Sequence, residues 1–441
     1  RSGWFMIPTR RLLVLLLLGA VVVAGASFAQ PLTWVAVLYF IALLGLMVAD
    51  YAVTTKPDQI SVARSNEAKL SLGVPNLVSI QLDNATPRVV RFQLRDEYPY
   101  QFRADAELLH GRLPPLDGVE LRYHVTPVAR GDYRWSDINL RYRSTLGTFI
   151  RQARYPAAAD VRVYPNVLDV RKYDLLARKG LLTELGLRNA KVFGAGTEFE
   201  RLRDYTPDDE FKRINWKATA RRSKPIAVEY ETERSQHVLC VLDAGRLMRP
   251  QLGDIQKLDY AINAALLTSY VASLRGDQIG MLTFADEVGV YLAPGKGRGQ
   301  FYTMLELLYN LQSQPVESDY GRALGYLSVK NKRRSLIVVF SDVVTLDAAQ
   351  PLIAYMGRLA RHHLPLLVTM NDPNITRLVA QPPSTTTDVY QRAVAEQMLA
   401  ERRVILDTLD RAGVLTLDVP ADKLSIAVIN KYLELKTRGV L

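Results

Sequence analysis

The sequence has a single cysteine, Cys240, so it can form no intrachain disulfide. Cys240 lies in the apolar run HVLCVLDAG, where a lone cysteine is typically a small core residue rather than a catalytic thiol. The five histidines show none of the spacings that zinc sites require. A disulfide-stabilised fold and zinc chemistry are therefore not expected.

Phosphate-binding and dinucleotide-binding loops are also missing. GKGRG at 295–299 lacks the Lys-Ser/Thr ending of a phosphate loop, and GAG at 194–196 lacks the third glycine of a dinucleotide fingerprint. Both stretches are interpreted as turns.

The chain has 441 residues, which is enough for two or three domains. Its formal net charge is +11, and arginine supplies most of the excess in the first half. A basic surface favours nucleic acid or an anionic membrane as a partner. Because the N-terminus is apolar, the membrane is the interpretation we adopt, and no nucleic acid is expected.

Two uncharged apolar segments lie at the N-terminus, at 12–28 and 32–49. Each is near the short end of what crosses a bilayer core of about 30 Å. A three-residue AQP stretch separates them, which predicts a transmembrane helical hairpin over 1–54 with Pro31 in the turn.

The charges around the first segment predict its orientation. Arg1, Arg10 and Arg11 precede it, and positive charge tends to remain cytoplasmic. The expected location is the inner (plasma) membrane of a bacterium, with the bulk of the chain cytoplasmic. The alternative is a cleaved signal peptide, in which case 32–49 still crosses once.

Residues 55–165 contain short runs of period-two alternation broken by turn residues, which predicts a small β-sandwich-like domain. In RVVRFQLRD, Val90, Phe92 and Leu94 share one face, and arginines and a glutamine share the other. The arginine-rich faces are interpreted either as surfaces near anionic lipid headgroups or as ordinary solvated faces.

Residues 237–441 alternate short apolar runs with amphipathic segments. This pattern predicts a doubly wound α/β domain with a parallel sheet covered on both faces. Sites in such sheets lie beyond the carboxyl ends of the strands, where the sequence places Asp243, Asp286 and Asp342. Residues 166–236 are expected to be a linker that includes a highly charged segment.

That segment, GAGTEFERLRDYTPDDEFKRINWKATAR, resembles the signature of domain-of-unknown-function family 58. Asp208 stands where the family pattern has glycine, and Asn215 stands where it has aspartate. The matching positions are Gly196, Glu198, Phe199, Leu202, Arg203, Tyr205, Asp208, Asp209, Ile214, Trp216, Lys217, Ala220 and Arg221.

The resemblance implies a von Willebrand factor A-like α/β domain, which agrees with the pattern over 237–441. Members of the family are commonly encoded beside AAA+ ATPases of the MoxR type and are thought to act as their partners. No enzymatic activity is established for the family. The resemblance therefore implies a protein-interaction role, with no catalytic residue.

A von Willebrand A domain often binds Mg²⁺ through Asp-x-Ser-x-Ser, a threonine and a further aspartate. Here DAGRL keeps Asp243 but has Gly245 in place of the first serine and Leu247 in place of the second. Ser318 stands near the threonine position, and Asp342 stands at the last position. The sequence predicts a degenerate site, binding Mg²⁺ weakly or capping the following helices instead.

A guanidinium offers another way to neutralise these carboxylates. Arg246 lies close in sequence and is expected to pair with them in place of a metal ion.

We interpret the charged segment as a clasp that fixes two domains. Arg203 and Arg221 are expected to pair with Glu198, Asp208 or Asp209, and the aromatic residues to pack on the α/β domain. PIAVEYETE is expected to run into or beside the main sheet. The alternatives are an envelope enzyme using carboxylates of 198–217, or a basic module that binds nucleic acid or anionic lipid.

Overall fold

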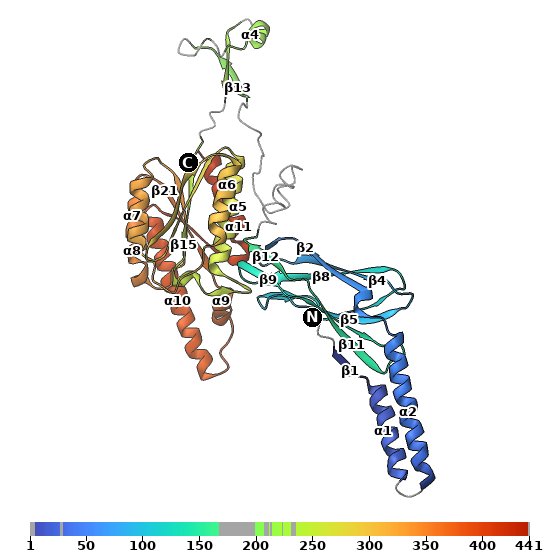
Figure 1. Ribbon diagram of the computed structural model, residues 1–441. Coiled ribbons are helices and arrows are strands. Elements are labelled where there is room, and N and C mark those ends of the chain that lie inside the picture. The colour runs from blue at the N-terminus through green and yellow to red at the C-terminus, as the bar shows by residue number, and fades with distance from the viewer. Residues whose placement is uncertain are drawn as a thin grey trace. The chain divides into compact units, whose positions relative to one another are not determined.

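The computed structural model describes residues 5–26, 30–166, 199–206, 211, 214–222, 224–230 and 235–439. The chain divides into two compact units, Arg1–Tyr164 and Pro165–Leu441. The first unit contains two apolar helices and three β-sheets, and the second contains a mixed six-stranded sheet and its helices (Figure 1).

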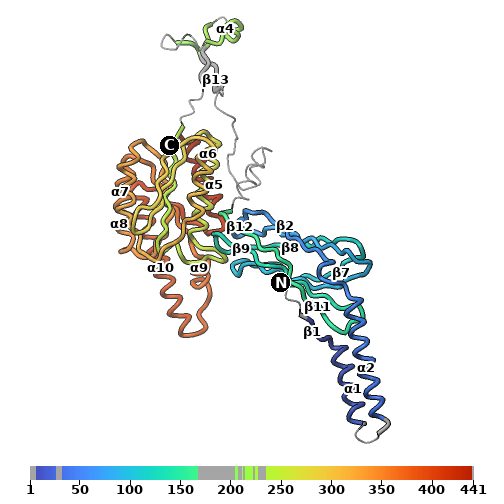
Figure 2. Tube along the Cα trace, viewed as in Figure 1, coloured from blue at the N-terminus to red at the C-terminus, as the bar shows by residue number. Residues whose placement is uncertain are grey.

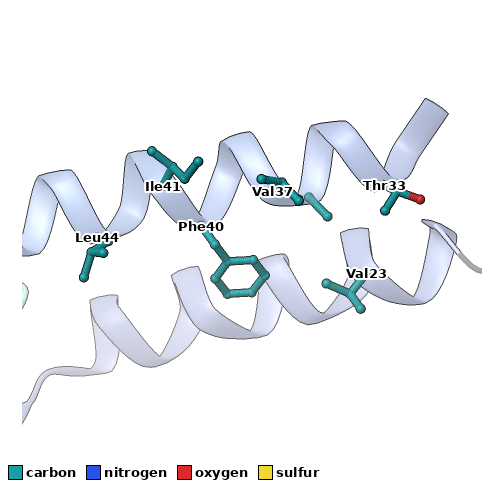
Figure 3. Close-up of a pocket in the computed structure, with 7 residues that line it drawn as sticks. Val23, Thr33, Val37, Phe40, Ile41 and Leu44 are labelled. Atoms are coloured by element: carbon teal, nitrogen blue, oxygen red, sulfur yellow. The ribbon is translucent and has the colours of Figure 1, made fainter. Parts of the chain in front are cut away.

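The two N-terminal helices are α1 (Arg10–Ala26) and α2 (Gln30–Val53). They lie side by side (Figure 1), and the ring of Phe40 on α2 points toward α1 (Figure 3). Within the described chain, one helical segment, Leu32–Gln59, is long and apolar enough to cross a membrane. Residues 27–29 lie outside the described part of the chain.

A glycine allows α1 and α2 to approach closely. A Cβ added at Gly19 would lie 2.8 Å from the ring of Tyr39 and 2.9 Å from that of Phe40. The Tyr39 hydroxyl donates a hydrogen bond of 2.6 Å to the backbone carbonyl of Leu15. Small residues and polar contacts of this kind hold helices together where no hydrophobic driving force is available.

Three sheets form the β part of the first unit. The five-stranded sheet has the order β1 (Phe5–Pro8), β11 (Phe149–Tyr155), β10 (Ile138–Arg143), β5 (Val90–Asp96) and β7 (Leu109–Leu113). The four-stranded sheet has the order β2 (Ile60–Asn66), β4 (Asn76–Asn84), β8 (Gly118–Pro127) and β6 (Phe102–Ala104). The third contains β3 (Lys69–Ser71), β12 (Ala159–Tyr164) and β9 (Gly131–Trp135).

The predicted alternation on β5 is confirmed, because Val90, Phe92 and Leu94 are buried and the residues between them are exposed. A buried ion pair joins the two larger sheets: Arg64 of β2 donates two hydrogen bonds to Asp96 of β5. These features agree with a small sandwich-like arrangement whose core lies between apolar sheet faces.

The loop between β10 and β11 binds the ends of both helices. Asp50 of α2 accepts hydrogen bonds from the backbone N–H groups of Leu146 (2.7 Å) and Thr148 (3.0 Å). It also accepts hydrogen bonds from the hydroxyls of Ser144 and Thr148. At the start of α1, the backbone N–H of Thr9 donates to the carbonyl of Thr148. The helices are therefore fixed to the five-stranded sheet at one end.

Arg151 of β11 reinforces this attachment. Its buried guanidinium donates to the carbonyls of Thr55 (2.9 Å), Thr54 and Tyr51 at the C-terminal end of α2. A cation at this position binds carbonyls that have no partner within the helix and interacts favourably with the helix dipole.

In the second unit, β13 (Phe199–Asp204) pairs antiparallel with β14 (Ile226–Tyr230), and α4 (Trp216–Arg222) lies between them in the chain. The expectation that PIAVEYETE enters or flanks the main sheet is wrong for the described part. Residues 226–230 form a separate two-stranded sheet with β13, since that strand satisfies their backbone hydrogen bonds.

The six-stranded sheet has the order β19 (Val288–Gly295), β18 (Gln278–Phe284), β15 (His237–Asp243), β20 (Leu336–Phe340), β21 (Leu364–Asn371) and β22 (Leu415–Pro420). Five strands are parallel, as predicted, and β19 pairs antiparallel with β18 at the edge. The prediction of an all-parallel sheet is wrong at β19, because this strand returns directly from β18 through a short turn.

Helices cover the sheet on both faces, with α7 and α8 on one side and α5, α6 and α11 on the other (Figure 1). Their bounds are α5 (Lys257–Leu274), α6 (Gly297–Tyr309), α7 (Tyr320–Lys330), α8 (Leu346–Leu359), α9 (Pro373–Ala380), α10 (Thr386–Arg411) and α11 (Leu424–Thr437). Cys240 of β15 is fully buried, and burial raises the pKa of its thiol to about 12. The prediction that it is a core residue is confirmed.

Candidate functional site

The candidate site lies where β15 and β20 end. The chain order of the strands reverses between these two neighbours, and ligands of doubly wound sheets bind at such a reversal. Asp243 is the last residue of β15, and Asp342 follows β20 by two residues. Both carboxylates are buried, so their hydrogen-bond partners decide what the site can do.

Four donors saturate the Asp243 carboxylate. Its Oδ1 accepts from the Gly245 backbone N–H at 2.8 Å and from the Ser318 hydroxyl. Its Oδ2 accepts from Ser341 at 2.6 Å and from Tyr320 at 3.2 Å. Burial raises the pKa of Asp243, and the hydroxyl donors oppose that rise. The predicted proximity of Asp243 and Ser318 is therefore seen.

Two cations of the protein itself neutralise Asp342. Lys257, the first residue of α5, places its Nζ 2.5 Å from Oδ2. Arg402 of α10 places Nη1 2.7 Å from Oδ1, which also accepts from the Val343 backbone N–H. The Asp342 carboxylate is thus bound by positive charge on both oxygens.

Arg402 uses all five of its N–H groups. It donates to both oxygens of Asp418, to Asp342, and to the carbonyls of Val343 and Met370. Burial lowers the pKa of Arg402, but the carboxylates of Asp418 and Asp342 outweigh burial and raise it. The guanidinium therefore links the ends of β20, β21 and β22 through a planar donor set that lysine lacks.

The donor set does not fit a Mg²⁺ ion. Mg²⁺ requires near-octahedral oxygen ligands at about 2.0–2.1 Å, whereas Lys257 and Arg402 hold the oxygens of Asp342. A side chain at position 245 would also collide with the Ser318 hydroxyl, so the first missing serine has no space here. We refer to Asp243, Asp342, Asp418, Lys257 and Arg402 as the strand-end centre.

The strand-end centre cannot readily act as an acid, base or nucleophile. A catalytic group must reach a reacting atom, and here each carboxylate oxygen is already bound by an internal donor. What the arrangement does is fix α5 and α10 rigidly against the carboxyl edge of the sheet.

An arm projects beyond that edge. It consists of α9 and the first half of α10, and both figures of the whole chain show it extending past the strand ends (Figures 1 and 2). No described residue of α9 is buried, and Ala395 is the first buried residue of α10. The arm exposes Tyr390 by 71% and Val394 by 58%.

The starts of both arm helices are capped. Asp372 accepts from the backbone N–H of Asn374 at the start of α9. Thr385 and Asp388 form a reciprocal capping box at the start of α10, with the Asp388 carboxylate also accepting from Ser384. Capping of this kind stabilises a helix start that little tertiary packing supports.

Only some of the predicted signature residues lie in the described part of the chain. Gly196, Glu198, Asp208 and Asp209 lie outside the described residues, as do the side chains of Phe199 and Arg203. The ion pairs predicted for Arg203 and Arg221 with these acids therefore stay predictions.

Two signature aromatics, Trp216 and Tyr205, have described side chains. Trp216 is 60% exposed and packs edge-on against Phe211, with ring centroids 5.6 Å apart. This exposure differs from the buried position expected of a clasp. Tyr205 is half-buried, and its backbone N–H donates to the carbonyl of Pro225.

The remaining signature residues form the start of α4. Asn215 caps the helix, because its side chain accepts from the Ala218 backbone N–H at 3.0 Å. Lys217 and Arg221 of the same helix are both exposed. Asn215 stands where the family pattern has aspartate, and it still provides a side chain that caps the helix.

One expectation about charges at the strand ends is wrong, whereas Asp286 does lie just past the end of β18. Arg246 pairs with the exposed Glu317 rather than with the buried carboxylates, because Lys257 and Arg402 already occupy Asp342. Asp286 is exposed, and what it contributes is its backbone carbonyl, which accepts from Arg322.

Comparison with known proteins supports the signature. Residues 201–396 match the family described as "Protein of unknown function DUF58". This DUF58 match includes β13, α4 and most of the α/β unit, with the first part of α10 at its end.

Similar proteins are themselves uncharacterized. Relatives from Mycobacterium bovis and Mycobacterium tuberculosis are each 24% identical over 265 residues, covering 56% of this chain and 82% of the relative. The Bacillus subtilis protein YeaD is 24% identical over 127 residues, covering 28% of this chain and 31% of its own.

Solved structures match weakly. A CARDB domain from Pyrococcus furiosus is 15% identical and matches 24% of this chain and 94% of its own, with a TM-score of 0.17. A matrix protein of the mussel byssus is 12% identical, and the match covers 45% of this chain and 46% of the byssus protein, with a TM-score of 0.28. These scores are too low to identify a fold.

Proposed function

We propose that the protein is a non-enzymatic scaffold, anchored in the bacterial plasma membrane by α1 and α2, with its bulk in the cytoplasm. The family resemblance implies a von Willebrand factor A-like domain, and the mixed α/β sheet with its antiparallel edge strand is compatible with that assignment. Its partner is an AAA+ ATPase of the MoxR type, or a client of one. This partner follows from the family resemblance rather than from a contact in the structure.

The observation that carries the proposal is the strand-end centre. Internal cations and hydroxyls occupy its carboxylates. The centre therefore stabilises the fold and presents no free reactive group at the position where doubly wound sheets usually bind ligands. A domain that contributes no reactive group there functions by presenting a surface.

The arm supplies that surface. Exposed tyrosines are frequent anchors of protein interfaces, and neighbouring apolar side chains help to exclude water around them. Tyr390 and Val394 lie four residues apart on α10 and therefore share one face of the helix. Arg402 fixes the base of the same helix to three strands, so the arm is held in one direction.

The test is affinity purification from native membranes in a gentle detergent, followed by mass spectrometry. Wild-type protein should co-purify an AAA+ ATPase, and Tyr390→Ala/Val394→Ala should lose at least about tenfold of it, as expected for two interface anchors. Asp342→Ala is unsuitable as the probe, since it would remove the carboxylate partner of the largely buried Lys257 and one of the two carboxylates that Arg402 binds.

A matched control tests whether the effect is specific to the arm or follows from the loss of any two exposed apolar side chains. Tyr302 on α6 and Val329 on α7 are 61% and 69% exposed, so Tyr302→Ala/Val329→Ala removes the same side chains elsewhere. The control should retain the ATPase. Absence of any ATPase from wild-type samples, or equal loss in both double variants, would contradict the proposal.

A further inference from the structure

The exposed face of the five-stranded sheet carries a row of arginines on three neighbouring strands. Arg91 of β5 pairs directly with Arg112 of β7. Tyr142 of β10 pairs with Phe92 of β5, so the next residue, Arg143, lies beside Arg91. All three arginines are exposed. Like charges opposite one another destabilise a sheet, so an external counter-charge would stabilise the row.

The described part of the chain provides no carboxylate for this row. No ion pair joins Arg91, Arg112 or Arg143 to an acid among the described residues, whereas Arg154 of the same sheet pairs with Asp137 at 2.6 Å. The next row along the face adds Arg141, which donates to the uncharged Gln152.

The arginine row lies at the end of the sheet that holds the helices. Arg143 directly precedes Ser144, whose hydroxyl binds Asp50 of α2 at 2.6 Å. A Cβ placed at Gly147 would lie 3.2 Å from Arg11 Nη1 and 3.6 Å from Arg143 Cδ. Arg11 in the first turn of α1 therefore extends the row toward the helix pair, which leaves the unit at this end (Figure 1).

We propose that Arg91, Arg112 and Arg143, extended by Arg11, bind the phosphates of anionic lipid headgroups where α1 and α2 enter the membrane. This inference rests on the membrane anchoring in the proposed function. Guanidinium groups bind phosphate through paired, charge-assisted hydrogen bonds. One basic residue near an anionic leaflet strengthens binding by about fivefold.

The composition of the face favours lipid over nucleic acid. Proteins that bind single-stranded nucleic acid stack bases on aromatic side chains. The outward residues of β5 and β10 are Arg91, Gln93, Arg95, Asn139, Arg141 and Arg143, and none is aromatic. Phosphate recognition without base stacking fits a headgroup layer.

The experiment uses the full chain in neutral detergent, titrated with equimolar phosphatidylglycerol and phosphatidylcholine, with bound lipid counted by native mass spectrometry. Wild type should retain phosphatidylglycerol preferentially. Arg91→Gln/Arg112→Gln/Arg143→Gln should lower that preference by about 10- to 100-fold, given the fivefold contribution of each arginine. Added salt should lower the wild-type preference, because it screens exposed charges.

A matched triple variant tests whether the lipid preference depends on the position of the arginines or only on the net charge of the protein. Arg122, Arg134 and Arg162 are exposed arginines on the other two sheets, paired with Glu120, Asp160 and Asp132 respectively. Changing these three to glutamine removes the same charge and should leave the lipid preference unchanged. Thermal unfolding should be similar in both triples, since all six side chains are exposed.

Three results would overturn the inference. The first is equal retention of both lipids by wild type, and the second is the same loss in both triples. The third is binding of a single-stranded oligonucleotide that depends on the row while lipid preference does not. Failure of the anchoring itself would appear separately, as loss of every variant from the membrane fraction.

Discussion

Arg402 on α10 and Asp342 beyond the end of β20 are joined by a hydrogen bond of 2.7 Å, although 60 positions separate them in sequence. Lys257 binds the other oxygen of Asp342, and Asp418 binds the other side of Arg402. The charges of these four side chains balance within the protein. Asp342 and Asp418 therefore need no metal ion to balance their charge.

Replacing Arg402 with methionine should strongly destabilise the α/β unit. It leaves Asp342 with one cation and Asp418 with none, and breaking a buried pair typically costs about 3–5 kcal/mol. The measurement is denaturant unfolding of the full chain in detergent. Arg403→Met changes the neighbouring exposed arginine and should shift unfolding by less than about 0.5 kcal/mol. Equal effects would show that the network contributes little.

Removing divalent cations should not change stability. If the site bound Mg²⁺, a free Mg²⁺ concentration of ten times the Kd would raise the free energy of unfolding by about 1.4 kcal/mol. Because Lys257 and Arg402 hold the Asp342 oxygens, unfolding midpoints with Mg²⁺ and with EDTA should coincide. A stabilisation by Mg²⁺ that Asp243→Asn abolishes would contradict the ion-paired centre.

Asp50→Ala should loosen the attachment of α2 to the β10–β11 loop. Four donors, two backbone and two hydroxyl, lose their buried acceptor, which typically costs at least about 1–3 kcal/mol. Hydrogen exchange at Leu146 and Thr148 should accelerate. Asp58→Ala alters an exposed aspartate on the same side of the unit and should leave these amides protected. Unchanged exchange in Asp50→Ala would argue against this attachment.

The cap of the arm should depend on pH in the acid range. Hydrogen bonds from Ser384 and Thr385 lower the pKa of Asp388 from its ordinary value of 3.8 to about 2. Because the pKa is lowered in the folded state, the ionised carboxylate stabilises the cap fully above about pH 4. This stabilisation is lost as the pH falls through about 2.

Carboxyl carbon NMR of aspartate-labelled protein measures this titration, with Asp388→Asn assigning the resonance. Asp372, which caps α9, provides an internal comparison in the same spectra. A midpoint for Asp388 near the ordinary aspartate value would show that the capping box does not form in solution.

Local patterns in the sequence predicted much of the fold. Apolar runs gave the parallel strands because buried strands of a covered sheet have no polar face. The edge strand β19 was missed, since its sequence, VGVYLAPG, has largely half-buried side chains and no clean alternation.

The carboxylates of the strand-end centre were predictable, but their partners were not. Strand ends place Asp243 and Asp342 by a general rule of doubly wound sheets. Lys257 and Arg402 lie 85 and 60 positions from Asp342, and only the packing of α5 and α10 brings them there. Arg246 was chosen because it is close in sequence, and tertiary packing favoured the two distant cations.

The central claim is that the arm presents α10 to an AAA+ ATPase. Its most direct test is a photo-crosslinking amino acid placed at position 390 in native membranes, with position 302 on α6 as the matched exposed site. The account predicts an ATPase adduct at 390 and none at 302. An ATPase adduct at 302 alone, or no adduct at 390 in cells that express the ATPase, would contradict it.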